Sequence, residues 1–242
     1  MTVDIDEIEF FRDTASFEFG GEVLLAVGDL HLGLERSLQD SGYTIPLGEE
    51  ETIESKLRDS LYQADPDVVV LNGDIHHKFG ELGPIGKTIK RLGDIVENSG
   101  AEVVYVEGNH DTMLDKVVET RDWYLFKPTE SDVTVCCLHG DDMPVDLPDA
   151  DLYVVGHDHP YVKIQMDKQP CYLYGDFDES RVLVTPPFNP FCSGTVVNGM
   201  DSGDFMSPFI RGDFGRFRLV IEKEDGDVLE FPEIRGFRNM LS

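Results

Sequence analysis

Every histidine in this chain lies in one of five short segments, and each segment begins with an apolar run. The same segments contain Asp29, Asp74 and Asn109. Imidazole, carboxylate and amide groups are the side chains that bind divalent metal ions, and clusters of them mark functional sites. The histidines are His31, His76, His77, His110, His139, His157 and His159.

A subset of these side chains is large enough to hold two metal ions. Asp29 and His31 alternate across one residue, so an extended turn can direct both groups at one ion. Asp74 has two carboxylate oxygens and could bridge two ions. Seven ligands are too many for one tetrahedral zinc but suit two ions with mixed oxygen and nitrogen shells. The predicted ligands are Asp29, His31, Asp74, Asn109, His139, His157 and His159.

Such a pair of ions predicts a specific reaction. Two metal ions about 3.5–4 Å apart can hold a hydroxide and bind phosphate oxygens, which suits in-line displacement at phosphorus. His110 is followed by Asp111, whose carboxylate could fix the imidazole tautomer and raise its pKa. We therefore expect phosphate-ester hydrolysis by a metal-bridging hydroxide, with His110 as general acid and Asp111 as its orienting partner. Manganese is the expected metal, because it accepts mixed carboxylate and imidazole ligands, with iron, zinc and nickel as alternatives.

Each of these polar turns has a plainer explanation by itself, because Asp and Asn often satisfy backbone groups in turns. Their coincidence favours metal binding. Elsewhere we prefer the plain interpretation: a surface imidazole for His76, solvated charge for two basic residues, and packing for four residues that could otherwise line a substrate groove. The basic residues are Arg36 and Lys78, and the packing residues are Trp123, Phe188, Asn189 and Phe191.

The elements that must position these side chains are buried strands. Continuous β-branched runs bounded by turns suit a largely parallel sheet covered on both faces, and sites assemble at the carboxyl ends of its strands. Apolar faces predict helices over residues 48–63 and 84–98, which end near Pro66 and Gly100. The five strand-and-turn segments span residues 21–33, 67–77, 101–111, 133–140 and 151–160.

After Pro160 the pattern changes to short alternating runs that predict antiparallel strands. Between them, residues 186–215 are rich in Pro, Gly, Asn and Phe, and we expect an ordered loop over the sheet rather than a domain boundary. A length of 242 residues then suits a single domain. The alternating runs span residues 162–166, 171–175, 181–185, 216–222 and 227–231.

The charge of the chain is extreme, with 48 acidic and 20 basic residues and a formal net charge of -28. At low ionic strength this surface would repel itself and any nucleic acid. A basic partner is one explanation. Adaptation to a salt-rich cytosol is preferred, because high salt screens the repulsion.

The apolar runs are too short to cross a bilayer, and residues 1–9 carry four acids and no base, unlike a secretory or transit peptide. We expect a soluble cytoplasmic protein. The four cysteines form no CxxC pair, which favours buried reduced thiols over a zinc site or a disulfide. They are Cys136, Cys137, Cys171 and Cys192.

The ordered set GDLH (28–31), GD (73–74), GNHD (108–111), HG (139–140) and GHDH (156–159) resembles the calcineurin-like metallophosphoesterases. The resemblance implies an α/β fold, a four-layer αββα sandwich of two mixed sheets between helices. It also implies that Asp29, His31 and His159 serve one metal and that Asp74 bridges. Three residues would then serve the other metal: Asn109, His139 and His157.

Within that family, residues 28–35 and 73–79 are most similar to small archaeal phosphoesterases related to the SbcD nucleases. That likeness implies that His77 assists at the phosphate and that the substrate is nucleic acid, DNA or RNA. Little chain remains after residue 160 for a separate DNA-capping domain. A small-molecule or cyclic-nucleotide diester is therefore the rival substrate, and a metal-binding interaction module without turnover is the alternative from another class.

Overall fold

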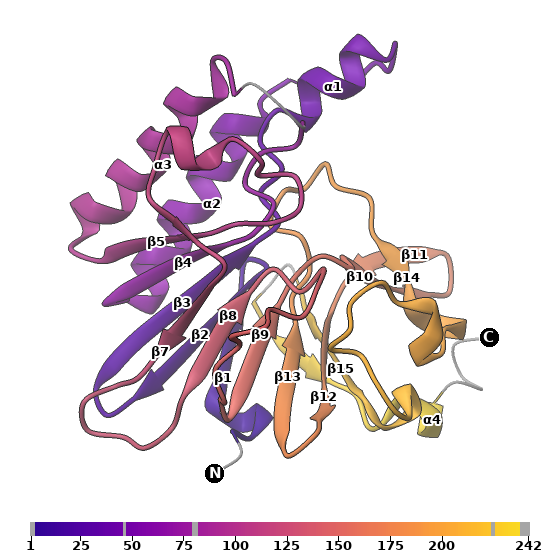
Figure 1. Ribbon diagram of the computed structural model, residues 1–242. Helices are drawn as coiled ribbons and strands as arrows, with labels where there is room; N and C mark the ends of the chain where they lie inside the picture. Colours follow the sequence, from indigo (N-terminus) through magenta and orange to yellow (C-terminus); the bar gives the residue numbers. More distant parts are fainter. Residues whose placement is uncertain (1–2, 46, 79–81, 224–225, 238–242) are drawn as a thin grey trace.

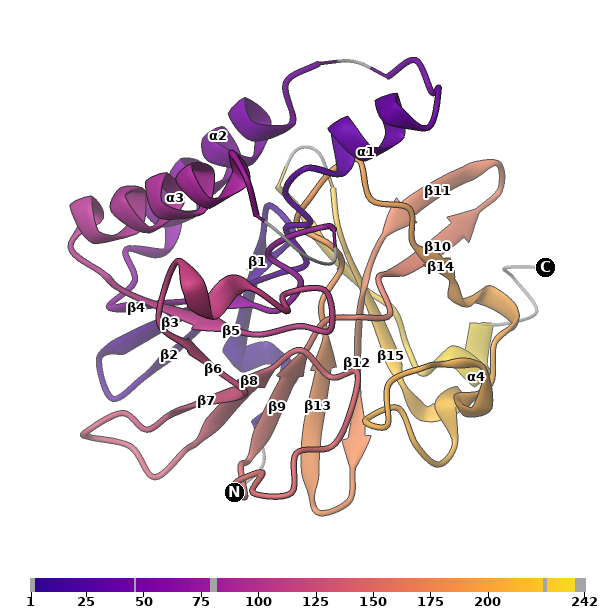
Figure 2. The ribbon, with the colours of Figure 1, turned by 45° about the horizontal axis from the view of Figure 1, so that its top comes forward.

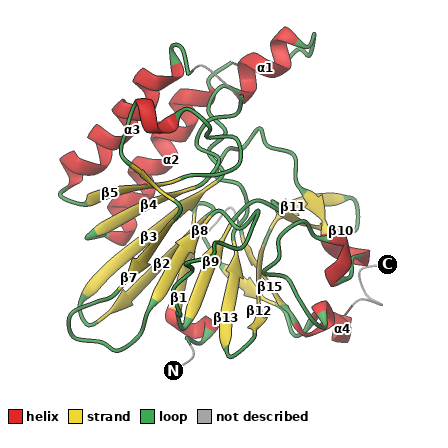
Figure 3. Ribbon diagram, in the orientation of Figure 1, coloured by secondary structure: helices red, strands yellow, loops and turns green. Residues whose placement is uncertain are grey.

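The computed structural model describes residues 3–45, 47–78, 82–223 and 226–237. Two sheets pack face to face, and helices cover the outer face of the first sheet (Figures 1 and 3). The first sheet has the strand order β1-β2-β3-β4-β5-β6 and is parallel from β3 to β6. Its strands are β1 (Ile8–Phe11), β2 (Thr14–Phe19), β3 (Glu22–Gly28), β4 (Val68–Asn72), β5 (Glu102–Val106) and β6 (Thr120–Arg121).

The second sheet has the order β16-β15-β12-β13-β9-β8-β7. Among its described strands, the pairs β13 with β9 and β9 with β8 are parallel and the other pairs are antiparallel. Its strands are β7 (Trp123–Phe126), β8 (Val135–Leu138), β9 (Leu152–Val155), β12 (Tyr172–Phe177), β13 (Ser180–Val184), β15 (Arg218–Glu222) and β16 (Val228–Glu230). A smaller sheet contains β10 (Pro160–Ile164), β11 (Asp167–Pro170) and β14 (Thr195–Val196).

The helices lie mainly on one side. Figure 2 shows α2 and α3 side by side over the first sheet, with α1 beyond them. On the other side, 3-10 turns and the short α4 pack against the second sheet through residues such as Phe214 and Ile234. The helices are α1 (Leu34–Asp40), α2 (Glu49–Ala64), α3 (Ile85–Ser99) and α4 (Ile234–Phe237), and the 3-10 turns are Ile5–Glu7, Leu114–Lys116, Val197–Gly199, Ser202–Asp204 and Phe214–Arg216.

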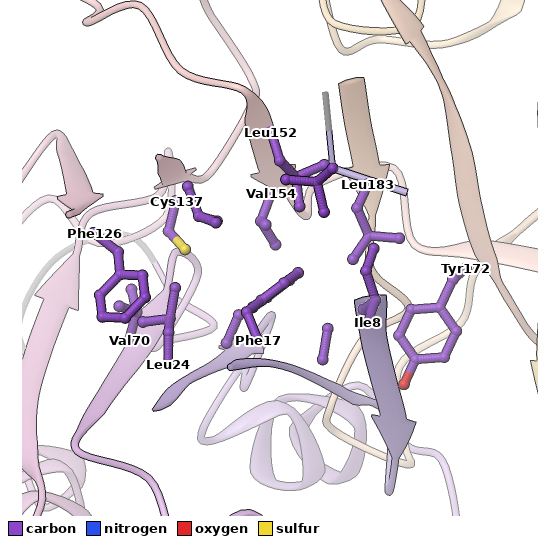
Figure 4. Close-up of a cluster of buried hydrophobic side chains, with 14 of the residues drawn as sticks. Ile8, Phe17, Leu24, Val70, Phe126, Cys137, Leu152, Val154, Tyr172 and Leu183 are labelled. Carbon is purple, nitrogen blue, oxygen red and sulfur yellow. The ribbon is translucent and has the colours of Figure 1, made fainter. Parts of the chain in front are cut away.

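Apolar side chains from both sheets interlock between them (Figure 4). Phe17 and Leu24 of the first sheet and Leu183 of the second are fully buried there. A second cluster joins Ile53 of α2 and Leu92 of α3 to the outer face of the first sheet. The alternation of these faces fixes the register of the central strands, and with it the positions of the turns that follow them.

The predicted α/β sandwich is confirmed, and the two predicted helices coincide with α2 and α3. Residues 186–215 form an ordered loop with short elements, as expected. The antiparallel prediction after Pro160 is only partly right, because β13 also pairs in parallel with β9. Within the described segments, no helix is long and apolar enough to cross a membrane.

Candidate metal centre

The polar turns that follow β3, β4, β5, β8 and β9 meet at one end of the sandwich (Figure 1). The first two are joined by backbone hydrogen bonds, from His31 N to Asp74 O at 2.7 Å and from Asp29 N to Gly73 O at 3.2 Å. Five of the predicted ligands have positive φ angles, which non-glycine residues rarely adopt and which concentrate at functional sites. They are Asp29, His31, Asp74, His157 and His159.

Two glycines in these turns are required by close packing. A Cβ at Gly108 would overlap the backbone and carboxylate of Asp74, and a Cβ at Gly156 would overlap the carboxylate of Asp29. Glycine therefore lets one turn approach the ligand carried by another.

Four of the predicted ligands form the first group. Nε2 of His159 lies 3.2 Å from Oδ1 of Asp29 and 3.2 Å from Nε2 of His31. Nε2 of His31 lies 3.4 Å from Oδ2 of Asp74. Burial lowers the pKa of His31 to about 3, so this imidazole is neutral and has a lone pair to offer.

The second group includes the other oxygen of Asp74. Nε2 of His139 lies 3.5 Å from Oδ1 of Asp74, 3.1 Å from Oδ1 of Asn109 and 3.1 Å from Nδ1 of His157. Burial lowers the pKa of His139 to about 4. Asp74 therefore faces one group with each carboxylate oxygen, and all seven predicted ligands lie together.

The electrostatics of this cluster suit cations. Burial, followed by the charge of Asp29, raises the pKa of Asp74 to about 8. Burial also acts to raise the pKa of Asp29, but the surrounding imidazoles, His159 foremost, lower it to about 2. Facing imidazole nitrogens 3.1–3.2 Å apart can share only one proton, and Nδ1 of His139 is buried without a hydrogen-bond partner among the described residues. The donors present therefore fit two divalent ions with mixed oxygen and nitrogen ligands.

His110 lies at the edge of this cluster, with Nε2 3.9 Å from Oδ2 of Asp74. Its Nδ1 lies 2.6 Å from the backbone oxygen of His77. The carboxylate of Asp111 instead accepts hydrogen bonds from the backbone nitrogens of Ile75, His76 and Gly108, at 2.8–3.0 Å. The prediction that Asp111 orients the His110 ring is therefore wrong: the His77 carbonyl occupies that position, and Asp111 joins two ligand turns.

The neighbouring histidines also differ from expectation. His76 was predicted to be a surface imidazole, but it is only 4% exposed. Its backbone forms an isolated parallel β-bridge with that of Leu32. His77 is half-buried, its ring stacks against that of His110 with centroids 5.8 Å apart, and its Nδ1 lies 3.5 Å from Nδ1 of His31. Burial lowers the pKa of both His76 and His77.

Of the residues assigned to packing or solvent, Arg36 is exposed, and Lys78 is exposed and pairs with Asp40 at 3.3 Å. Phe188 is buried in the cluster under the helices. Trp123, in β7, is partly buried in the cluster on the outer side of the second sheet, and Phe191 is partly buried.

Several supporting residues were not recognised from the sequence. Nδ2 of Asn72 donates to Leu138 O at 2.9 Å and Val154 O at 3.2 Å, so it joins the two sheets behind the ligand turns. Asp158, between two predicted ligands, accepts from the backbone nitrogens of Met206 and Ser207. The position of Asn72 directly before the GD motif could have indicated a supporting role for it. For Asp158, the sequence offered only its place inside the GHDH motif.

A pocket of about 440 Å³ adjoins the second group, with Asn109, His139 and Gly140 in its wall. Five further residues of its lining are acidic. The carboxylates are those of Glu107, Asp122, Asp141, Asp142 and Asp146. A pocket of this size is within the usual range for small-molecule sites.

A sequence model of the calcineurin-like phosphoesterases matches residues 23–148, just over half of the chain. The chain belongs to the calcineurin-like phosphoesterase family. It is thus a member of a family of metal-dependent hydrolases. The match contains the first four motifs and ends at residue 148, before His157 and His159.

Relatives of this calcineurin-like phosphoesterase differ in how much of it they resemble. An Arabidopsis thaliana protein named "Probable inactive purple acid phosphatase 14" is 26% identical over 130 residues, which are 52% of this chain and 32% of that protein. The chain thus spans about a third of the length of that relative. The crystal structure of Pseudomonas putida nuclease MPE aligns with 90% of this chain and 100% of its own, with a TM-score of 0.56 and 19% identity, which shows a shared fold.

Proposed function

We propose that this protein hydrolyses phosphodiester bonds with two divalent metal ions. The observation that carries the proposal is the position of Asp74, whose two carboxylate oxygens face two separate groups of ligands at 3.4 and 3.5 Å. Asp29, His31 and His159 would hold one ion with Asp74. The remaining three ligands, Asn109, His139 and His157, would hold the other.

When bound, the ions supply Lewis acidity and an activated water for attack on phosphorus. His110 would then protonate the departing ester oxygen. Nδ1 of His110 lies 2.6 Å from the His77 carbonyl oxygen, which can only accept, so Nδ1 carries a proton and donates a hydrogen bond to that oxygen. Nε2, the other ring nitrogen, then faces the ligand cluster. A protonated Nε2 can donate to a leaving group beside Asp74. His77 would assist at the phosphate, and Asp111 would hold the turn that carries Asn109 and His110.

Nucleic acid is the preferred candidate for the substrate. The nuclease likeness supports this choice at the level of fold. Manganese is the proposed metal because its octahedral geometry suits this oxygen and nitrogen donor set. The four free, buried thiols support a reducing cytoplasmic location, and the net charge of -28 supports work at high salt. We also propose that the chain is one domain.

One observation favours a second candidate. The acidic pocket beside Asn109 and His139 would repel a polyanion that extended across it. A small or cyclic diester would need to occupy only the phosphate position and could leave the carboxylates hydrated. The two substrates therefore differ in how far they must extend past the second group.

Hydrolysis of a chromogenic phosphodiester tests the enzyme against a non-catalytic metal-binding module. We expect turnover with added manganese at high salt, and a loss of about 10²–10⁴-fold in kcat in His110→Ala with metal content unchanged. No turnover with manganese, iron, zinc, nickel or cobalt, despite two bound metal ions, would identify an interaction module instead.

Plasmid and single-stranded DNA, RNA and cyclic nucleotides then separate the substrates. Cleavage of nucleic acid at high salt is expected. Cleavage confined to cyclic or other small diesters would reject the nucleic-acid choice and favour the second candidate.

A further inference from the structure

One of the four cysteines lies at the metal centre rather than in a core. Sγ of Cys192 and ring nitrogens of His31 and His159 all lie within 4.8 Å of one another. The other cysteines have apolar surroundings: Cys137 lies between the sheets, and Cys136 and Cys171 lie on the outer side of the second sheet. Cys192 belongs to none of the three apolar clusters found among the described residues.

The loop that carries Cys192 is fixed on both sides of the thiol. Cys192 N donates to Asn189 O at 3.1 Å, and the hydroxyl of Tyr161 donates to Cys192 O at 3.3 Å. The same loop reaches His159, whose Nδ1 lies 3.3 Å from Ser193 O. Because this carbonyl can only accept, Nδ1 carries the proton, and Nε2 of His159 is turned toward Asp29 and His31.

We propose that the Cys192 thiolate is an additional ligand of the metal ion held by His31 and His159. This proposal rests on the two-metal function above and adds a sulfur donor to one of its two sites. In a tetrahedral site with bonds of about 2.0–2.3 Å, nitrogen and sulfur donors lie about 3.3–3.6 Å apart. Donor atoms that lie within 4.8 Å of one another would therefore close by about 1.2–1.5 Å at most when the ion binds. Formation of the sulfur–metal bond breaks the S–H bond and releases its proton to solvent.

A sulfur ligand makes the two sites chemically different. The site with Asn109 and His139 offers only oxygen and nitrogen donors, which suit manganese. The site with Cys192 favours softer ions such as zinc or iron. The first site would therefore prefer zinc or iron when these ions are present, and manganese stays the proposed metal of the second site and fills both sites when it is in excess.

Cobalt(II) substitution tests the sulfur ligand directly. The purified protein is stripped with a chelator, reloaded with cobalt and examined by absorption spectroscopy. We expect a sulfur-to-cobalt charge-transfer band in the near ultraviolet that is lost in Cys192→Ala and retained in Cys171→Ala. Cys171 is the matched control because it is a free, buried thiol in the second-sheet cluster.

Zinc affinity gives a second measurement. Competition with a chromogenic chelator should show at least a tenfold loss of affinity at one of two sites in Cys192→Ala, with the other site unchanged. Circular dichroism of both variants checks that the fold is intact. Two bound cobalt ions without the band, or a band that persists in Cys192→Ala, would overturn the proposal.

These readouts are separate from turnover. The band in a protein without phosphodiesterase activity would support the sulfur ligand while the proposed function failed. Activity with two bound ions and no band would retain the function and reject the ligand.

Discussion

The side-chain amide of Asn189 donates a hydrogen bond of 2.9 Å to the carboxylate of Glu49, 140 residues earlier in the chain. Glu49 is 3% exposed and also accepts from the backbone nitrogens of Gly33 and Glu35. Asn189 donates in addition to Leu30 O at 2.9 Å, between Asp29 and His31. The pair therefore connects the start of α1, the start of α2 and the loop before Cys192 to the first ligand turn.

Removal of the Asn189 amide should destabilise this region. In Asn189→Ala the buried Glu49 carboxylate loses a donor, and we expect unfolding in urea to become easier by about 1–3 kcal/mol. Gln39→Ala, at an exposed residue of α1 that contacts Glu35, should change the free energy of unfolding by less than about 0.5 kcal/mol. Equal stability of the two variants would mean that the Glu49 contact is unimportant.

Gly108→Ala should impair metal binding because its Cβ would overlap the backbone and carboxylate of Asp74. We expect the affinity for manganese to fall about 10–100-fold, which is the usual effect of changing a residue that supports a metal ligand. The affinity is measured by titrating the metal-free protein with manganese. Gly203→Ala is the control, since nothing lies within 4 Å of its added Cβ. Unchanged affinity in Gly108→Ala would show that the turn can move without cost.

Metal removal should lower the thermal stability of the whole protein. Ions that bind only the folded state add about 2.7 kcal/mol per site when present at 100 times their dissociation constant. Without them, the carboxylates of Asp29 and Asp74 share one buried cluster with no bound cation. Calorimetry with and without chelator should show a lower melting temperature that recovers on addition of metal; identical melting curves would contradict tight binding at this site.

Salt should stabilise the fold. The screening length falls from about 8 Å at 0.15 M to about 3 Å at 1 M, so repulsion among the 48 acidic residues weakens. We expect the melting temperature to rise between these two concentrations of potassium chloride. A melting temperature that is indifferent to salt would count against adaptation to a salt-rich environment.

The central strands and the two long helices could be predicted from the sequence alone, and so could the side chains that gather in the proposed metal centre. These features are local: a buried strand needs a continuous apolar run, and a turn at its end can carry Asp, His or Asn with little effect on the core. Asp74 and His139 could thus be predicted to lie at one edge of a sheet, because each follows a buried strand at its carboxyl end.

The contacts between these groups could not be predicted from the sequence. Asp111 is next to His110 in sequence, yet its carboxylate holds the turn of His76 and leaves the His110 ring to the His77 carbonyl. Glu49 begins a run of three acidic residues, yet its carboxylate is buried, where Asn189 and the start of α1 donate hydrogen bonds to it. Cys192 resembled any apolar thiol until the return of its loop placed it beside His31 and His159. Each contact joins chain segments that are separate in sequence: pairing of β4 with β5 brings the turn of Asp111 to that of His76, and the return of the loop after β13 brings Asn189 and Cys192 to the first ligand turn.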